Sequence, residues 1–181
     1  KMLMSVLNKG KITYADKEEI CLSGVKHPFL KLEQLDQDQL QHNRYYLDVL
    51  ECLNIKDPDF FRALSQMLLD GQEDMAIRAA MYLGRGKYFD DEIKQNIFLA
   101  LDRKKIDGFA AYAMGKYVTL KNKREIEALT KLLKIEYSGE SAAVIFSKLK
   151  PKDELIHVSL VEALNVTGVG SAAEYAIREI R

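Results

Sequence analysis

Residues able to act as acids, bases or metal ligands are scattered along this sequence rather than clustered. The chain has three histidines, each in a separate segment: His27, His42 and His157. No H-E-x-x-H motif occurs, which argues against zinc peptidase chemistry. His157 falls in an apolar segment and is interpreted as a structural histidine rather than a general base. We therefore expect no metal site and no catalytic residue, and the sequence favours a protein that is not an enzyme.

Adjacent carboxylates and a glycine-rich turn are the other features that could carry chemistry. The carboxylate pairs stand at predicted helix starts, where they complement the helix dipole: Glu18-Glu19, Asp90-Asp91 and Asp153-Glu154. The stretch GVGS at 168–171 lacks the lysine of a phosphate-binding loop, and we interpret it as a turn before the last helix. Neither feature predicts a cofactor, so none is expected.

The two cysteines, Cys21 and Cys52, form no C-x-x-C or C-x-x-H spacing. A metal site or a disulfide framework is therefore not supported by the pattern. We interpret both residues as small buried hydrophobic side chains in a reducing cytoplasm, rather than as reactive thiols. The sequence also lacks an apolar run of the ~20 residues that a membrane span needs. A cytoplasmic protein without a membrane segment is expected.

Charge is balanced across the 181 residues. Lys and Arg number 27 together, as do Asp and Glu, so the formal net charge is zero. This balance differs from the strongly basic composition of a general nucleic-acid binder. A chain of this length can bury a sizeable core without disulfides or metals, as one domain or one repeat array.

An adjacent pair of alanines recurs along the chain at intervals of 31, 32 and 30 residues. The pairs lie in four segments that align with one another: AIRAAMYLGRG (76–86), DGFAAYAMGKY (107–117), ESAAVIFSKLK (140–150) and GSAAEYAIREI (170–180). Each is preceded by another segment with apolar residues at helical spacing: 59–70, 91–102, 124–135 and 153–164. The pattern therefore predicts four helical hairpins in tandem.

The alanines indicate where the second helices of these hairpins make their closest contacts. Helices that pack 8 to 10 Å apart need small side chains at the contact, and alanine supplies one without the entropic cost of glycine. We expect the pairs to be buried against neighbouring helices. An isolated hairpin cannot bury its apolar face, so stacking of successive units would create the core.

The first third of the chain is less regular. Segments 15–24, 28–37 and 40–54 are predicted to be helical, but none matches the repeat. We interpret residues 1–55 as an irregular helical N-terminal cap or degenerate repeat, and residues 56–181 as four repeats of one continuous array. The one strand-like stretch, Lys11 to Tyr14, is too short and isolated to pair. The expected fold class is all-α.

The segment A-I-R-A-A-M-Y-L-G, preceded by D-G-Q-E-D and repeated about every 31 residues, resembles the short HEAT-like repeat of phycobilisome lyases and many bacterial proteins. The resemblance covers roughly 56–181 and is best around 74–86. Arg78 matches the arginine common in this repeat, whereas Phe109, Ser141 and Ser171 replace it later. Tetratricopeptide and ankyrin signatures do not occur. The resemblance implies a right-handed α-solenoid whose second helices line a concave binding face.

On that face, one register position is basic in every repeat: Arg85, Lys116, Lys148 and Arg178. A simpler interpretation is that these cations complement helix C-termini. Aromatic residues flank the column, and of these Phe109 is expected to lie in the core, like one ring of the pair Tyr45-Tyr46. The predicted partner-binding residues are Arg78, Tyr82, Arg85, Tyr112, Lys116, Lys148, Tyr175 and Arg178.

Two functions of different classes follow. The favoured hypothesis is a non-enzymatic scaffold that binds another protein, as an adaptor, regulator or immunity-type inhibitor. A partner with an acidic surface is one option. Tyrosine and arginine are enriched at such interfaces. The alternative is nucleic-acid binding through the basic column, by analogy with HEAT-like DNA alkylation repair glycosylases, although net charge and the lack of Trp weigh against it. Chromophore handling rests on the family resemblance alone, and self-association is a further option.

Overall fold

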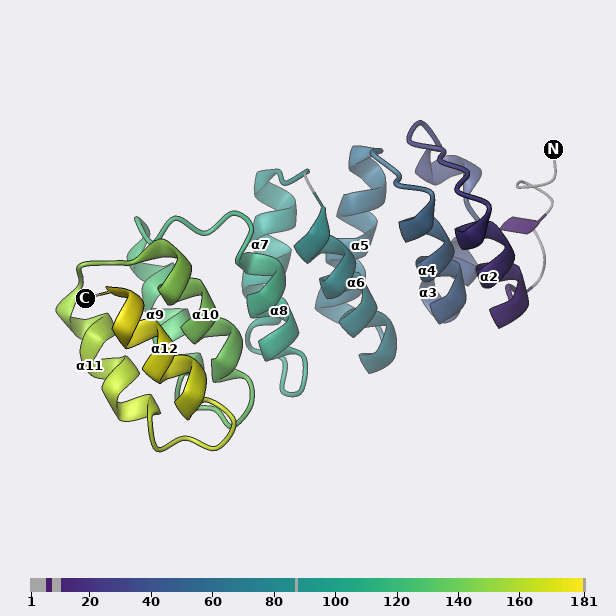
Figure 1. Ribbon diagram of the computed structural model, residues 1–181. Helices are drawn as coiled ribbons and strands as arrows, with labels where there is room; N and C mark the ends of the chain where they lie inside the picture. Colours follow the sequence, from purple (N-terminus) through teal and green to yellow (C-terminus); the bar gives the residue numbers. More distant parts are fainter. Residues whose placement is uncertain (1–5, 8–10, 87, 181) are drawn as a thin grey trace. The chain divides into compact units, whose positions relative to one another are not determined.

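The computed structural model describes residues 6–7, 11–86 and 88–180, and the regular elements of this part are all helical (Figure 1). The helices are α2 (Tyr14–Leu22), α3 (Gln37–His42), α4 (Arg44–Cys52), α5 (Pro58–Asp70), α6 (Glu73–Arg85), α7 (Asp91–Ala100), α8 (Asp107–Met114), α9 (Lys123–Leu132), α10 (Gly139–Leu149), α11 (Glu154–Ala163) and α12 (Gly170–Ile180), with a 3-10 turn, η1 (Leu32–Gln34). The expected all-α class is confirmed for these residues. Among them, no helix has both the length and the apolar character needed to cross a membrane.

The chain forms two compact units, Lys1–Ile93 and Lys94–Arg181, and each is described by itself. The boundary falls within the first turn of α7, after the third residue of that helix. Unit 1 contains α2 to α6, and unit 2 contains α8 to α12.

The core of unit 1 is the hairpin of α5 and α6. Pro58 starts α5 at a position where its missing amide hydrogen costs nothing, and the Asp57 carboxylate accepts a hydrogen bond from the Asp59 amide. The apolar stripe of α5 is buried: Phe60, Phe61, Leu64, Met67 and Leu68. Gly71 allows the tight turn into α6, because a Cβ there would lie 2.5 Å from the Met67 carbonyl oxygen. Helix α4 packs on α6 and on α2.

In unit 2 the second helices α8, α10 and α12 pack in succession, with α9 and α11 packed against each other. Gly139 begins α10 at a crowded point. A Cβ at this residue would lie 2.8 Å from the Leu132 carbonyl oxygen and 3.0 Å from Val169 Cγ1. The glycine therefore permits α10 to approach both α9 and the segment that leads into α12.

All four alanine pairs lie in helices, and seven of the eight alanines are buried as predicted. Ala79, Ala80, Ala110, Ala111, Ala142, Ala143 and Ala173 are fully buried, and Ala172 is half-buried. Gly115 also lies at a close contact, because a Cβ there would be 3.2 Å from Ile145 Cγ1 of α10. Small side chains therefore occupy the helix seams of both units.

Contacts about 30 residues apart recur within both units. In unit 1 they join Cys21 to Cys52, Asp48 to Arg78, and Leu50 to Tyr82. In unit 2 they join Asp107 to Ser138, Tyr137 to Thr167, and Lys150 to Glu179. The separations match the spacing of the alanine pairs, so elements one sequence repeat apart touch each other.

The structure corrects the prediction for the cysteines. Cys21 of α2 and Cys52 of α4 form a disulfide, and both residues are half-buried rather than part of an apolar interior. Their Cα atoms are 5.3 Å apart, which is within the usual range for a bridge. They pair because α2 packs on α4, a contact that short cysteine motifs such as C-x-x-C do not indicate.

Two smaller predictions are also corrected. Phe109, expected in the core, is 38% exposed, because it stands on the outer side of α8 while Ala110 and Ala111 face inward. The predicted helix over 28–37 is limited to the 3-10 turn η1, because the chain is extended at Lys31 and Leu35, and Asp36 already caps α3. For the Tyr45-Tyr46 pair the prediction is confirmed, since Tyr46 is fully buried and Tyr45 is partly exposed.

Candidate protein-binding surface

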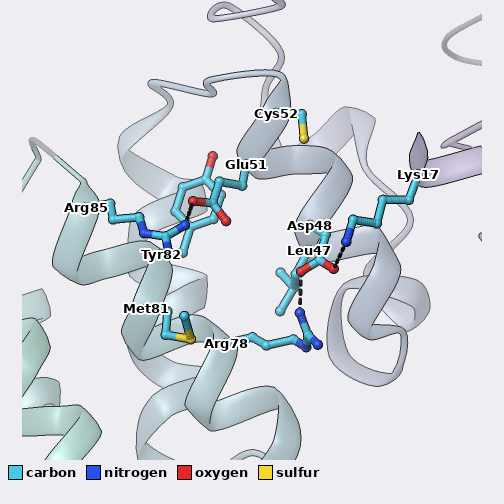
Figure 2. A pocket seen from close by; sticks show the side chains of 9 residues that line it. All are labelled: Lys17, Leu47, Asp48, Glu51, Cys52, Arg78, Met81, Tyr82 and Arg85. Carbon is cyan, nitrogen blue, oxygen red and sulfur yellow. Dashed lines mark hydrogen bonds and ion pairs between the residues drawn. The ribbon is translucent and has the colours of Figure 1, made fainter. Parts of the chain in front are cut away.

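Three of the predicted binding residues come together on α6 of unit 1. Arg78, Tyr82 and Arg85 line a cavity of about 250 Å³ between α6, α4 and α2 (Figure 2). The other lining residues are Lys17, Leu47, Asp48, Glu51, Cys52 and Met81. Helical spacing explains the grouping, because positions three and four residues apart on α6 share the face that meets α4.

Ion pairs between helices hold the charged wall of this cavity. The Asp48 carboxylate accepts from both sides: Lys17 Nζ lies 3.2 Å from Asp48 Oδ2, and Arg78 Nη1 contacts Asp48 Oδ1. A second pair joins Arg85 of α6 to Glu51 of α4 (Figure 2). The Asp48 side chain is only 16% exposed, so its two cations are less screened by water than those of a surface pair. The cluster thus links α2, α4 and α6 through one carboxylate.

Tyr82 was predicted to be an exposed partner-binding residue, but the structure places it in the core. Its ring is 7% exposed and packs edge-on against Phe60, with 5.3 Å between ring centroids. The hydroxyl donates a hydrogen bond to the Leu50 carbonyl oxygen at 2.9 Å. Burial raises the pKa of Tyr82, so the phenol stays neutral. Tyr82 therefore positions α6 against α4.

A larger cavity of about 540 Å³ adjoins this ion-pair cluster in unit 1. It shares Glu51, Tyr82 and Arg85 with the first cavity and adds an apolar wall that includes Phe61 and Tyr88. The Arg85–Glu51 pair borders both spaces. Arg85 is 54% exposed in its side chain, so its pair with Glu51 is solvated and weak. The outer edge of α6 thus combines an apolar floor with a polar rim.

The remaining predicted binding residues lie in unit 2, and unlike Tyr82 they are exposed to solvent. The exposed ones are Tyr112, Lys116, Lys148, Tyr175 and Arg178. Lys116, Lys148 and Arg178 belong to the successive second helices or their ends, and Arg178 pairs with Glu174 on the same helix. Tyr112 is 45% exposed and Tyr175 is 57% exposed. In contrast, Tyr117 is half-buried and donates to the Lys94 carbonyl oxygen at 3.1 Å.

Sequence analysis missed one regular feature of this surface. The residue directly after each alanine pair is exposed in all four repeats: Met81, Tyr112, Val144 and Glu174. Three of these side chains are large and apolar, with exposed fractions of 36% to 45%. The repeat alignment contained the signal, because a helix that buries two alanines turns the next residue to its outer side. We call Tyr112 and Val144, with the basic residues Lys116 and Lys148, all of unit 2, the second-helix surface.

The second-helix surface offers groups suited to contact with another molecule. It combines apolar side chains with cations, and the described residues contain no cluster of His, Cys, Asp or Glu that could hold a metal ion. A partner could bury the apolar groups and pair with the cations.

Comparison with known proteins yields no match to this chain, whether among protein-family models, curated proteins or solved structures. The interpretation of the second-helix surface therefore rests on its own residues.

Proposed function

We propose that this protein is a non-enzymatic scaffold that binds another protein on its second-helix surface. The observation that carries the proposal is the exposure of Tyr112 and Val144 at one register position of α8 and α10, two helices of unit 2 that pack on each other. Aromatic side chains are enriched in protein interfaces relative to the rest of the surface. Exposed apolar side chains that recur in register supply contact area at regular intervals for a partner.

The chemistry of the surface suggests the character of the partner. Each of its two apolar residues is followed four positions later by an exposed lysine, Lys116 or Lys148. Lys148 lies on α10 one helical turn after Val144, so these two side chains are neighbours on the helix, and Lys116 lies in the turn that follows α8. A partner that presents apolar side chains beside carboxylates would complement both. An adaptor, a regulator or an immunity-type inhibitor would each use such a surface.

We propose in addition that the repeats form a right-handed HEAT-like solenoid with period about 31, capped by residues 1–55. The contacts between residues about 30 positions apart support this arrangement within each unit. The buried alanine pairs support it as well, since they allow close packing of successive second helices. In such a fold the second helices would line the concave face.

Nucleic-acid binding is the second candidate, and the exposed cations of unit 2 favour it. Lys148 and Arg178 lie on α10 and α12, Lys116 lies in the turn after α8, and these three helices pack in succession. If the protein contacted six or more phosphates, its affinity for duplex DNA would fall about a thousandfold or more between 50 and 200 mM salt. Three cations predict a shallower slope, which Lys116→Glu with Lys148→Glu would abolish. An anisotropy titration that detects no binding at 50 mM salt excludes this candidate.

A site-specific photo-crosslinker tests the scaffold proposal. We expect a benzophenone amino acid at Tyr112 to crosslink one protein from native lysate. The matched control is the same group at Gln95, an exposed position of α7 in the same unit, which should give no specific product. With that partner purified, Tyr112→Ala or Lys148→Glu should weaken binding about tenfold, which corresponds to about 1.4 kcal/mol. Equal products from both positions, or none from Tyr112, would contradict the proposal.

The cytoplasmic location expected from the sequence stays a prediction. It depended in part on interpreting both cysteines as free thiols, and the Cys21–Cys52 disulfide removes that part of the argument. Disulfides persist mainly in oxidising compartments. Free-thiol titration of protein from its native source would decide whether the bridge is closed there.

A further inference from the structure

Helix α11 differs from the other first helices in the character of its outer side. On α9 the exposed residues are all charged: Lys123, Arg124, Glu127 and Lys131. On α11 and at its C-terminal end, four large apolar residues are exposed by 40% to 56%: Leu155, Val158, Val161 and Leu164. They recur every third residue, so each lies beside the next along the helix. The inner side of α11 is apolar as well, with Ile156, Leu160 and Ala163 buried.

A helix that is apolar on all sides is normally covered on all sides. The inner side of α11 packs on α12 and α9, and these contacts leave its four outer apolar residues facing solvent. Acidic residues accompany them: Glu154 and Glu162 are exposed, and Glu162 pairs with Lys134 of the preceding repeat at 3.1 Å. We name Leu155, Val158, Val161 and Leu164, together with Glu154 and Glu162, the acidic α11 patch.

Unit 1 carries a surface of the opposite charge. Residues 22–31, between α2 and η1, have the sequence LSGVKHPFLK and contain no carboxylate. Leu22 is 84% exposed and Phe29 is 88% exposed, the two highest values among the large exposed apolar residues. Lys26 and Lys31 are exposed between and beside them, and within the described part of the chain neither ammonium is paired with a carboxylate. We name Leu22, Val25 and Phe29, with the two lysines, the basic loop patch.

We propose that the acidic α11 patch of one molecule binds the basic loop patch of a second copy of this chain. Both patches combine large exposed apolar residues with charges of opposite sign, and of the two carboxylates Glu162 already shares its charge with Lys134. Contact would remove the apolar side chains from water and pair Glu154 and Glu162 with Lys26 and Lys31. Two acidic α11 patches placed together would instead set carboxylates against each other, which disfavours symmetric pairing.

The contact joins two different surfaces, so it is heterologous. Each molecule keeps one free patch of each kind, and the association continues as an open chain unless its geometry closes a ring. The number of apolar side chains is small, and their flanking charges are screened by salt. The self-association should therefore depend on both protein concentration and ionic strength. It does not involve the second-helix surface, which stays free to bind a protein partner.

Charge reversal on each patch tests the contact by sedimentation velocity. For the unaltered chain we expect the average mass to rise above that of one molecule as concentration increases, and less so at 0.5 M NaCl. Lys26→Glu with Lys31→Glu should lose this rise, and so should Glu154→Lys with Glu162→Lys. A mixture of the two variants should recover it, because each then presents the charge that the other lacks. The matched control, Lys104→Glu with Lys121→Glu, alters two exposed lysines outside both patches and should change nothing.

Circular dichroism melting of each variant distinguishes a lost contact from a lost fold. Phe29→Ser provides a second variant, which leaves all charges intact and should lower the association by about tenfold or more. The proposal is overturned if the unaltered chain stays a single molecule at its highest soluble concentration. It is also overturned if folded charge variants still associate alone, or if their mixture stays unassociated.

Discussion

Single alanines at the helix seams show how one side chain controls the packing of this protein. Ala143 is fully buried in α10, and the next residue, Val144, is 36% exposed. The two positions differ by one step along the same helix, yet one faces neighbouring helices and the other faces solvent. Substitutions at these two positions of one helix therefore differ in their effect on packing but share the same helical backbone.

Replacing Ala143 with leucine should destabilise the protein by about 1 to 3 kcal/mol, because the added carbons have no space in the seam. Val144→Leu enlarges the exposed neighbour and should change the free energy of unfolding by about 0.5 kcal/mol or less. Urea unfolding followed by circular dichroism measures both values. Similar costs for the two variants would mean that the seam is not tightly packed.

Tyr46 is the residue through which alkaline pH should act on stability. Its ring is fully buried, and its hydroxyl oxygen accepts a hydrogen bond from the Asp36 amide at 2.8 Å. Burial raises the pKa of Tyr46 from 10.0 to about 12. The folded protein therefore keeps the phenolic proton at pH values where the unfolded chain has lost it. The stability due to the neutral phenol is complete below pH 10 and is lost as pH rises toward 12.

We expect the loss to approach 1.4 kcal/mol per pH unit for this group within that window. Tyr46→Phe should remove this part of the pH dependence, while at pH 7 it costs about 1 kcal/mol through the unpaired Asp36 amide. Unfolding free energies at pH 8 and pH 11 measure the difference. Tyr82 and Tyr117, whose pKa values are also raised by burial, remain in both proteins and cancel in the comparison. An identical decline in the variant would contradict this assignment.

Among the elements, α2 depends most on specific links. Ile20 is its one buried apolar residue, so the helix has little apolar area with which to pack on α4. Thr13 and Asp16 form a capping box that starts the helix. The Lys17–Asp48 ion pair and the Cys21–Cys52 disulfide attach it to α4. Helices α5 and α6, in contrast, are held by large buried side chains.

Removal of the disulfide by Cys21→Ser with Cys52→Ser should reduce stability by about 2 to 4 kcal/mol. The effect should be greatest at α2, because its remaining contacts are few. Hydrogen exchange is expected to show faster exchange for amides of α2 and little change in α5. A dithiol reductant should have the same effect on the unaltered chain and none on the double variant. Unchanged protection of α2 would show that its other contacts suffice.

For the whole molecule, balanced net charge conceals an uneven distribution. The chain sums to zero, yet the basic loop patch and the acidic α11 patch each carry one sign beside exposed apolar groups. The second-helix surface is a third region, with cations at regular register positions. The head-to-tail association proposed above belongs to this scale, since it depends on two surfaces in different units and on no single residue. Protein binding and self-association can therefore be tested separately.

The sequence alone determined the all-α class, the helices of the regular segments and the burial of seven of the eight paired alanines. These features follow from local periodicity and from side-chain size, which neighbouring residues along the chain specify. The exposed basic residues of unit 2 were also predictable, because helical spacing assigns them to the outer side of their helices. The match between the cysteine separation of 31 and the repeat spacing was the one signal that could have predicted the disulfide.

Only the tertiary structure decided which residues meet across helices. It buried Tyr82 against Phe60, exposed Phe109, joined Cys21 to Cys52 and placed Asp48 between Lys17 and Arg78. Each outcome depends on how one helix packs on another, and several arrangements of the same amphipathic helices satisfy the same local pattern. Local periodicity specifies which side of a helix is buried, whereas the partner on that side is chosen by the packing of the whole unit.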